Sequence, residues 1–181
     1  MEGYDGLVRR LVRCLSGSGL DYAFTGALAV SFYGSPRTTS DVDVMIAVGG
    51  GDVDKPNIIK ALRCAGLEAS DRDIEAALTS GYNIASFEDG ASPFNVDVIF
   101  SPDKLEKQSG KVAGVDTFLQ LPEGLIAAKL RMIKASLSRE RAGRDEEDVR
   151  AILRFTRVDV EAVKRRAERD GTLDIFEYLI E

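Results

Sequence analysis

The spacing of apolar residues divides the chain into a mixed α/β part and a helical part. Apolar residues at helical spacing predict amphipathic helices, and short runs of β-branched and apolar residues between turn residues predict strands. Up to residue 121 the expected helices are 7–15, 27–33, 57–65 and 71–78, and the expected strands are 21–25, 42–48, 82–87 and 95–100. From Pro122 onward only helices are expected, at 123–138, 145–155, 159–169 and 173–180. We therefore predict an α+β fold, with a mixed α/β core over residues 1–121 and a helical C-terminal region over residues 122–181.

The composition is typical of a soluble globular protein with one core. Of the 181 residues, 44% are hydrophobic and 30% are charged, and both values are ordinary. No apolar run approaches the roughly 18–20 residues that span a bilayer, and the first residues are acidic where a secretory signal is basic. We expect a cytoplasmic protein with no membrane partner. In it Cys14 and Cys64 are expected to be buried small side chains that do not form a disulfide.

The chain contains no histidine, and this restricts its chemistry. Activation of a nucleophile by a Ser-His-Asp or Cys-His arrangement is excluded, and so is hydrolysis by a histidine-bound zinc. Catalysis must therefore use carboxylates, Lys, Arg, Tyr or a metal.

Charge is unevenly distributed along the sequence. The net charge is −6, but residues 129–169 hold 13 Lys and Arg against 8 Asp and Glu. Such a basic segment can bind a phosphate-rich partner, for example tRNA, even in an acidic chain. Two solvated helix surfaces would explain the same charges, so the pattern leaves the partner open.

Two carboxylates, Asp41 and Asp43, lie at the start of the strand expected at 42–48. Residues two apart on a strand share one face and lie roughly 6.5–7 Å apart along it. The carboxylates repel each other unless a cation lies between them, and hard divalent cations such as Mg²⁺ prefer oxygen ligands. Upstream, Gly26 and Ala27 form a small-residue turn where backbone can approach a bulky anion. A phosphate-binding turn followed by metal ligands indicates chemistry on a nucleoside triphosphate (NTP).

Asp97 is the third candidate acid, in the strand expected at 95–100. A carboxylate among apolar strand residues is costly to bury unless it is paired, hydrogen-bonded or bound to metal. The alternative is that Asp97 is exposed at the end of its strand and has only a structural role. If this strand lies beside 42–48, Asp41, Asp43 and Asp97 could together hold two metal ions. Asp97 would then be the general base that activates an acceptor hydroxyl.

The order of these elements resembles a known superfamily. Gly26-Ala27, a spacer of thirteen residues, the segment Asp41-Val42-Asp43-Val44 and the later Asp97 are similar to the DNA polymerase β nucleotidyltransferase superfamily. The resemblance implies the nucleotidyltransferase fold, in which helices flank a small mixed β-sheet. It also implies that Mg²⁺ or Mn²⁺, held by the three acids, assists transfer of a nucleoside monophosphate (NMP) from an NTP to a hydroxyl, with release of pyrophosphate.

Further residues look like the minimal nucleotidyltransferases of the abortive-infection toxin and antibiotic-nucleotidyltransferase kind. They are Gly34, Arg37 and Thr39 before the acids, then Lys129, and then Arg144 to Asp148 within residues 143–149. The resemblance implies a toxin–antitoxin protein that binds the nucleotide through Gly26, Ala27, Arg37, Thr39 and Lys129. Arg37 also suits a helix cap or an ion pair, and Lys129 a surface position. For Arg144, Asp145 and Asp148 the sequence leaves open whether they serve the site or brace a helix.

One departure from the family pattern is Ala27, where Gly or Ser is usual. Ala27 offers its backbone N–H at the start of a helix but has no hydroxyl. A catalytically degenerate binding module is therefore the main alternative, and a carboxylate-dependent metal nuclease is a third reading of the acids. The turn at Gly26-Ala27 favours an NTP over the nuclease. The acceptor, whether RNA, protein or a small molecule, is not indicated.

Overall fold

The computed structural model describes residues 3–49 and 53–181 and confirms the α+β fold. Its strands are β1 (Tyr22–Phe24), β2 (Asp41–Ala47), β3 (Ile84–Glu88), β4 (Asn95–Ser101), β5 (Lys107–Val112) and β6 (Val115–Gln120). Its helices are α1 (Tyr4–Ser18), α2 (Gly26–Tyr33), α3 (Lys55–Cys64), α4 (Asp71–Thr79), α5 (Pro122–Ala135), α6 (Arg139–Phe155), α7 (Val160–Asp170) and α8 (Leu173–Ile180).

The residues cluster into two compact units. The first contains Met1–Leu28 and Thr38–Leu119, and the second contains Ala29–Arg37 and Gln120–Glu181. The junction after Leu119 lies close to the boundary expected at residue 121. The segment Ala29–Arg37, which the sequence assigns to the core, belongs to the second unit.

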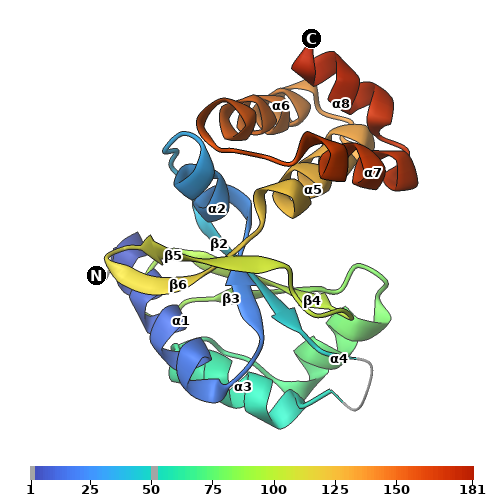
Figure 1. The fold of residues 1–181 in the computed structure, drawn as a ribbon. Coiled ribbons are helices and arrows are strands. Elements are labelled where there is room, and N and C mark those ends of the chain that lie inside the picture. Colours follow the sequence, from blue (N-terminus) through green and yellow to red (C-terminus); the bar gives the residue numbers. More distant parts are fainter. Residues whose placement is uncertain (1–2, 50–52) are drawn as a thin grey trace. The chain divides into compact units, whose positions relative to one another are not determined.

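The first unit is built on a mixed sheet (Figure 1), and its strand order is β3-β4-β2-β1-β6-β5. Strand β2 runs parallel to β4 and antiparallel to β1, and β3 runs antiparallel to β4. The pairing of β2 with β4 extends from Asp41↔Asn95 to Ala47↔Ser101. The condition that the sequence sets for Asp97 is therefore met, because its strand lies directly beside that of Asp41 and Asp43.

The two faces of the sheet differ in chemistry. The buried side chains of its central strands are Val42, Val44 and Ile46 on β2 and Val96, Val98 and Phe100 on β4. Helices α1, α3 and α4 lie on one side of the sheet and cover this apolar face (Figure 1). Because successive strand residues point to opposite faces, the acids at the intervening positions point away from this core. All three are partly accessible.

The structure corrects the prediction for the two cysteines. Cys14 on α1 and Cys64 at the end of α3 form a disulfide, with their Cα atoms 5.8 Å apart, a usual separation for such a bond. The two residues are 50 positions apart in sequence. The packing of α1 against α3 brings them together, and neither helix's own pattern reveals that contact.

The second unit is a small helical assembly in which α5 contacts α6, α7 and α8. Its buried apolar side chains come from all four helices: Leu125, Ile126, Leu130, Val149, Ile152, Val163, Ala167, Phe176 and Leu179. Tyr33 joins the segment Ala29–Arg37 to this unit, because its hydroxyl donates to the carbonyl of Gln120 at 2.7 Å. The Thr156 hydroxyl donates to the carbonyl of Tyr33 at 2.5 Å.

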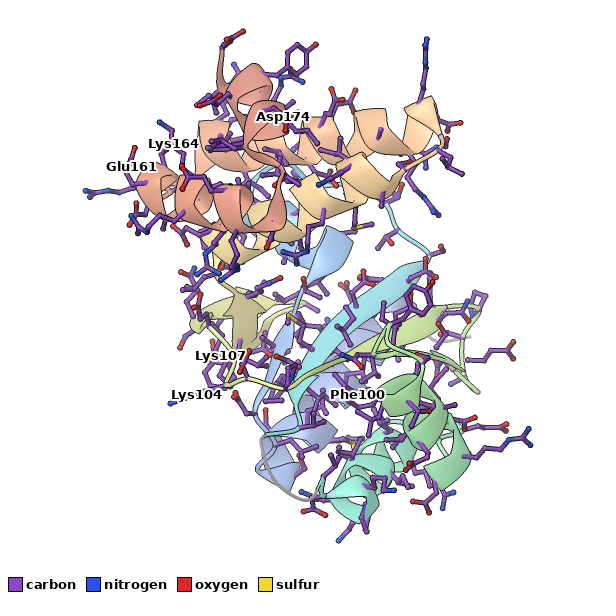
Figure 2. All side chains as sticks on the ribbon, turned by 90° about the vertical axis from the view of Figure 1, so that its right-hand side faces the viewer. Phe100, Lys104, Lys107, Glu161, Lys164 and Asp174 are labelled. Atoms are coloured by element: carbon purple, nitrogen blue, oxygen red, sulfur yellow. A yellow bond between two sulfur atoms is a disulfide. The ribbon has the colours of Figure 1, made fainter. Side chains whose placement is uncertain are left out.

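Helix α7 of the second unit exposes charged side chains. Glu161 and Lys164 are neighbours on α7 (Figure 2), and their charged atoms are 3.5 Å apart. Within residues 3–49 and 53–181, no helix has the length and apolar character needed to cross a bilayer.

Candidate active site

The carboxylates expected to hold a metal lie on the accessible face of the first unit's sheet. Asp41 and Asp43 share this face because they are two positions apart on β2. Asp97 on β4 is the register partner of Asp43. Adjacent strands lie about 4.8 Å apart, so Asp43 and Asp97 are neighbours across the sheet, and Asp41 lies one row further along beside Asn95.

The donor chemistry of these residues fits a hard divalent cation, since all three offer carboxylate oxygens on one face. Asp41 accepts a hydrogen bond from the Ser40 hydroxyl at 3.1 Å. In the described part of the chain, no three acidic or thiol side chains converge closely enough to form a ready metal cluster. The structure thus brings Asp43 and Asp97 together and leaves Asp41 as their neighbour on the same face.

Gly26 lies against Asp43, and the contact requires a glycine. Its φ is +59°, in the left-handed region that residues with a Cβ rarely adopt. A Cβ built on Gly26 would lie 2.6 Å from Cγ of Asp43, which is an overlap. The neighbouring Thr25 N–H donates to the carbonyl of Asp43 at 3.0 Å. The turn before α2 therefore lies beside strand β2, which carries Asp41 and Asp43, and Ala27 follows it as the second residue of the helix.

Thr39 shapes the chain just before Asp41. Its hydroxyl donates to the carbonyl of Asp41 at 3.1 Å and is close enough to accept from the Asp41 N–H at 3.2 Å. Thr39 thus contacts the backbone of the first acid and can set its orientation.

Two residues near the acids have no signal in the sequence pattern. Tyr4, the first residue of α1, lies with its hydroxyl 3.5 Å from the carbonyl of Asp41. Burial, and then the charges of Asp43 and Asp41, hold the pKa of Tyr4 far above its usual range, so its hydroxyl stays protonated. Ser86 on β3 donates a hydrogen bond to Oδ1 of Asp97 at 2.6 Å. Both contacts depend on tertiary placement.

Arg37 and Lys129 belong to a charge network within the second unit. Lys129 Nζ lies 2.7 Å from Oδ1 of Asp145 and 2.9 Å from Oδ2 of Asp148. Nη1 of Arg37 lies 2.5 Å from the same oxygen of Asp148. Lys129, Asp145 and Asp148 are buried, whereas about a third of the Arg37 side chain is exposed.

This network differs from the surface lysine that the sequence allows for Lys129. Two cations and two carboxylates offset each other's charges, which is the usual condition for burying charged groups. Oδ2 of Asp145 is buried and lacks a hydrogen-bond partner within the described residues. Asp145 and Asp148 thus hold Lys129, while Arg144 instead pairs with Glu140 along the exposed side of α6.

Comparison with known proteins gives a family and a fold. The model of the family described as nucleotidyl transferase AbiEii toxin, type IV toxin–antitoxin system, matches residues 9–178. No curated protein matches the chain in sequence.

Two solved structures share the fold over most of their length. An antigenic nucleotidyltransferase-like protein from Paracoccidioides brasiliensis is 15% identical with a TM-score of 0.60, covering 99% of this chain and 94% of that one. The antibiotic-resistance factor ANT(2'')-Ia is 14% identical with a TM-score of 0.59, covering 96% and 95% respectively. At these identities the likeness concerns the fold, and it agrees with the fold predicted from the acids and the turn.

Proposed function

Since this chain belongs to the AbiEii family of nucleotidyl transferase toxins, we propose that it moves an NMP from an NTP to a hydroxyl of an acceptor and releases pyrophosphate. The family makes the chain a nucleotidyltransferase. The donor, the metal and the acceptor are the proposed part.

One observation carries this proposal more than any other. Asp43 and Asp97 pair in register on neighbouring parallel strands, and Gly26 lies directly against Asp43. A glycine turn packed against one of two neighbouring carboxylates supports a site for a divalent cation and the NTP that it would bind, because carboxylate oxygens suit the cation and backbone without a side chain can approach closely.

We assign the roles by chemistry. Asp41, Asp43 and Asp97 would hold Mg²⁺ or Mn²⁺, which supplies charge neutralisation at the phosphates and acidifies an acceptor hydroxyl. Asp97 accepts the proton of that hydroxyl. Gly26 and Ala27 lie at the start of α2, where the helix dipole favours an anion.

Arg37, Thr39 and Lys129 complete the proposed nucleotide-binding set. Arg37 is the more accessible of the two cations, because it is partly exposed, and its guanidinium has five N–H donors. Lys129 is buried and paired with Asp145 and Asp148, so it could bind a nucleotide phosphate only by giving up one of these ion pairs. Thr39 acts through the backbone of Asp41.

The acceptor is an RNA such as tRNA, a protein hydroxyl or a small molecule. The basic residues 129–169 favour the RNA, because a polyanion gains from a local excess of cations.

The decisive experiment follows α-labelled NTP in the presence of Mg²⁺ or Mn²⁺, with RNA, protein and small alcohols as acceptors. Asp43→Asn should lower labelling by about 100-fold or more, because a metal ligand contributes several kcal/mol to the transition state. Asp116→Asn is the matched control, since it makes the same change on an exposed strand residue of the same sheet. Labelling that survives in folded Asp43→Asn would contradict the metal role.

A degenerate binding module is the second candidate, favoured by Ala27 in place of the usual Gly or Ser. It predicts that calorimetry detects ATP with Mg²⁺ while no acceptor is labelled. Turnover with any of the four NTPs excludes it.

A further inference from the structure

We propose that Ser86 is a positioning residue that fixes the carboxylate of Asp97. The inference rests on the proposed function, since it concerns the acid to which that function assigns the acceptor proton. Ser86 lies outside the sequence motifs that resemble the family, and only the pairing of its strand with β4 places it beside the acids.

The register places Ser86 in one row with two of the acids. Ser86 on β3 pairs with Asp97 on β4, and Asp97 pairs with Asp43 on β2. Paired residues of adjacent strands point to the same face of a sheet. The row Ser86–Asp97–Asp43 therefore crosses the accessible face from the edge strand to the metal-binding strand.

The hydroxyl of Ser86 contacts Asp97 directly. The hydroxyl oxygen of Ser86 and Oδ1 of Asp97 are 2.6 Å apart, at the short end of the range for an O–H···O hydrogen bond. The pairing of β3 with β4 fixes the backbone of Ser86, and this limits the positions that its hydroxyl can reach. This hydrogen bond restricts rotation of the carboxylate and leaves Oδ2 for a metal or an acceptor proton.

Ser86 is also the residue of β3 suited to this role. The same face of β3 carries Ile84 and Glu88, at the positions two before and two after Ser86. Neither side chain can donate a hydrogen bond to a carboxylate at neutral pH. Ala85 and Phe87 are buried on the opposite face.

A partner of this kind acts through the ligand that it orients. Residues that hydrogen-bond to metal-ligating side chains commonly change metal affinity or activity by about 10–100-fold when they are replaced. Because Ser86 is exposed on an edge strand, we expect an effect of about 10-fold, at the lower end of this range.

The experiment compares Ser86→Ala, which removes the donor, with Ser86→Thr, which keeps it in a strand-favouring residue. Ser109→Ala is the matched control, because Ser109 is exposed on β5, the other edge strand of the sheet. For each protein, kcat, the KM for NTP and the dissociation constant of Mn²⁺ alone are measured. Thermal unfolding checks that each variant is folded.

We expect Ser86→Ala to lower kcat by about 10-fold and weaken Mn²⁺ binding by a similar factor, with the KM for NTP within about twofold. Ser86→Thr should recover most of both losses, and Ser109→Ala should change neither. A purely structural role would affect stability while leaving Mn²⁺ binding unchanged.

The proposal is overturned if Ser86→Ala binds Mn²⁺ as the parent protein does, or if Ser86→Thr is no better than Ser86→Ala. If the parent protein labels no acceptor, the proposed function fails. The Mn²⁺ titration still decides the role of Ser86, because it requires no turnover.

Discussion

At position 26 the candidate site depends on the absence of a side chain. Gly26 has a positive φ, and its missing Cβ leaves the space that the Asp43 carboxylate occupies. In Gly26→Ala, the methyl group would displace that carboxylate from its place beside Asp97. We expect NTP-dependent labelling to fall about as far as in Asp43→Asn, by roughly 100-fold, as measured with α-labelled NTP.

Gly19→Ala separates this overlap from backbone strain. Gly19 also has a positive φ, of +73°, but a Cβ there meets no atom within 4 Å. Both variants should lose about 1–2 kcal/mol of stability to the strained backbone, and only Gly26→Ala should lose activity. Equal activity in the two variants would show that Asp43 tolerates displacement.

The three acids could be predicted from the sequence, whereas their neighbours could not. Asp43 and Asp97 stand out because each lies among apolar strand residues, where a carboxylate is costly to bury, and Asp41 stands out because it lies two positions before Asp43 and so shares its face. Ser86 is an ordinary serine until β3 pairs with β4, and that register is a long-range property. The burial of Lys129 has the same origin, since its two carboxylate partners come from another helix.

Among the elements, α1 and α3 are joined covalently by the Cys14–Cys64 disulfide. Closing a loop of this length restricts the unfolded chain, which typically stabilises a protein by about 2–4 kcal/mol. We expect Cys14→Ser/Cys64→Ser to lower the free energy of unfolding by that amount, measured in urea. Catalytic labelling should be unchanged, because the acids lie on the sheet face opposite these helices.

Reduction supplies the control for this prediction. Dithiothreitol should lower the free energy of unfolding of the parent protein to about the value of the double variant. It should leave the free energy of unfolding of the double variant unchanged. Two freely alkylated thiols in the unreduced, unfolded protein would contradict the disulfide.

The helices and strands β1 to β4 lie near their predicted ranges because each has an apolar side to bury, whereas strands β5 and β6 were not predicted. Strand β5 has no such signal: Lys107–Val112 is almost entirely polar, as an exposed edge strand can be. The first turns of α6 also lack an apolar pattern that would predict a helix, because their residues are mostly charged and solvent-exposed. There only the cap at Ser138, whose side chain accepts from the Arg141 N–H, marks the true start of the helix.

On the scale of the whole molecule, charge is segregated along the chain. The net charge is −6, yet residues 129–169 carry an excess of five positive charges. A net negative chain repels RNA on average, so RNA could bind productively only through a local field. Repulsion by the net charge and attraction by the basic residues 129–169 can be separated by making the same charge change in different parts of the molecule.

The last prediction uses two double variants that alter the net charge equally. Arg157→Glu/Arg165→Glu changes exposed residues of the second unit, and Lys60→Glu/Lys111→Glu changes exposed residues of the first. If the acceptor is RNA, the first pair should raise its KM by about 10-fold or more, because each lost phosphate contact weakens binding and reduces its salt dependence. The second pair should have a smaller effect, through net charge alone.

KM values for RNA and for an uncharged alcohol, measured across a salt series, provide the test. Equal effects of the two pairs on RNA would reject a local basic surface, and equal effects on both acceptors would show that the substitutions act on the catalytic site.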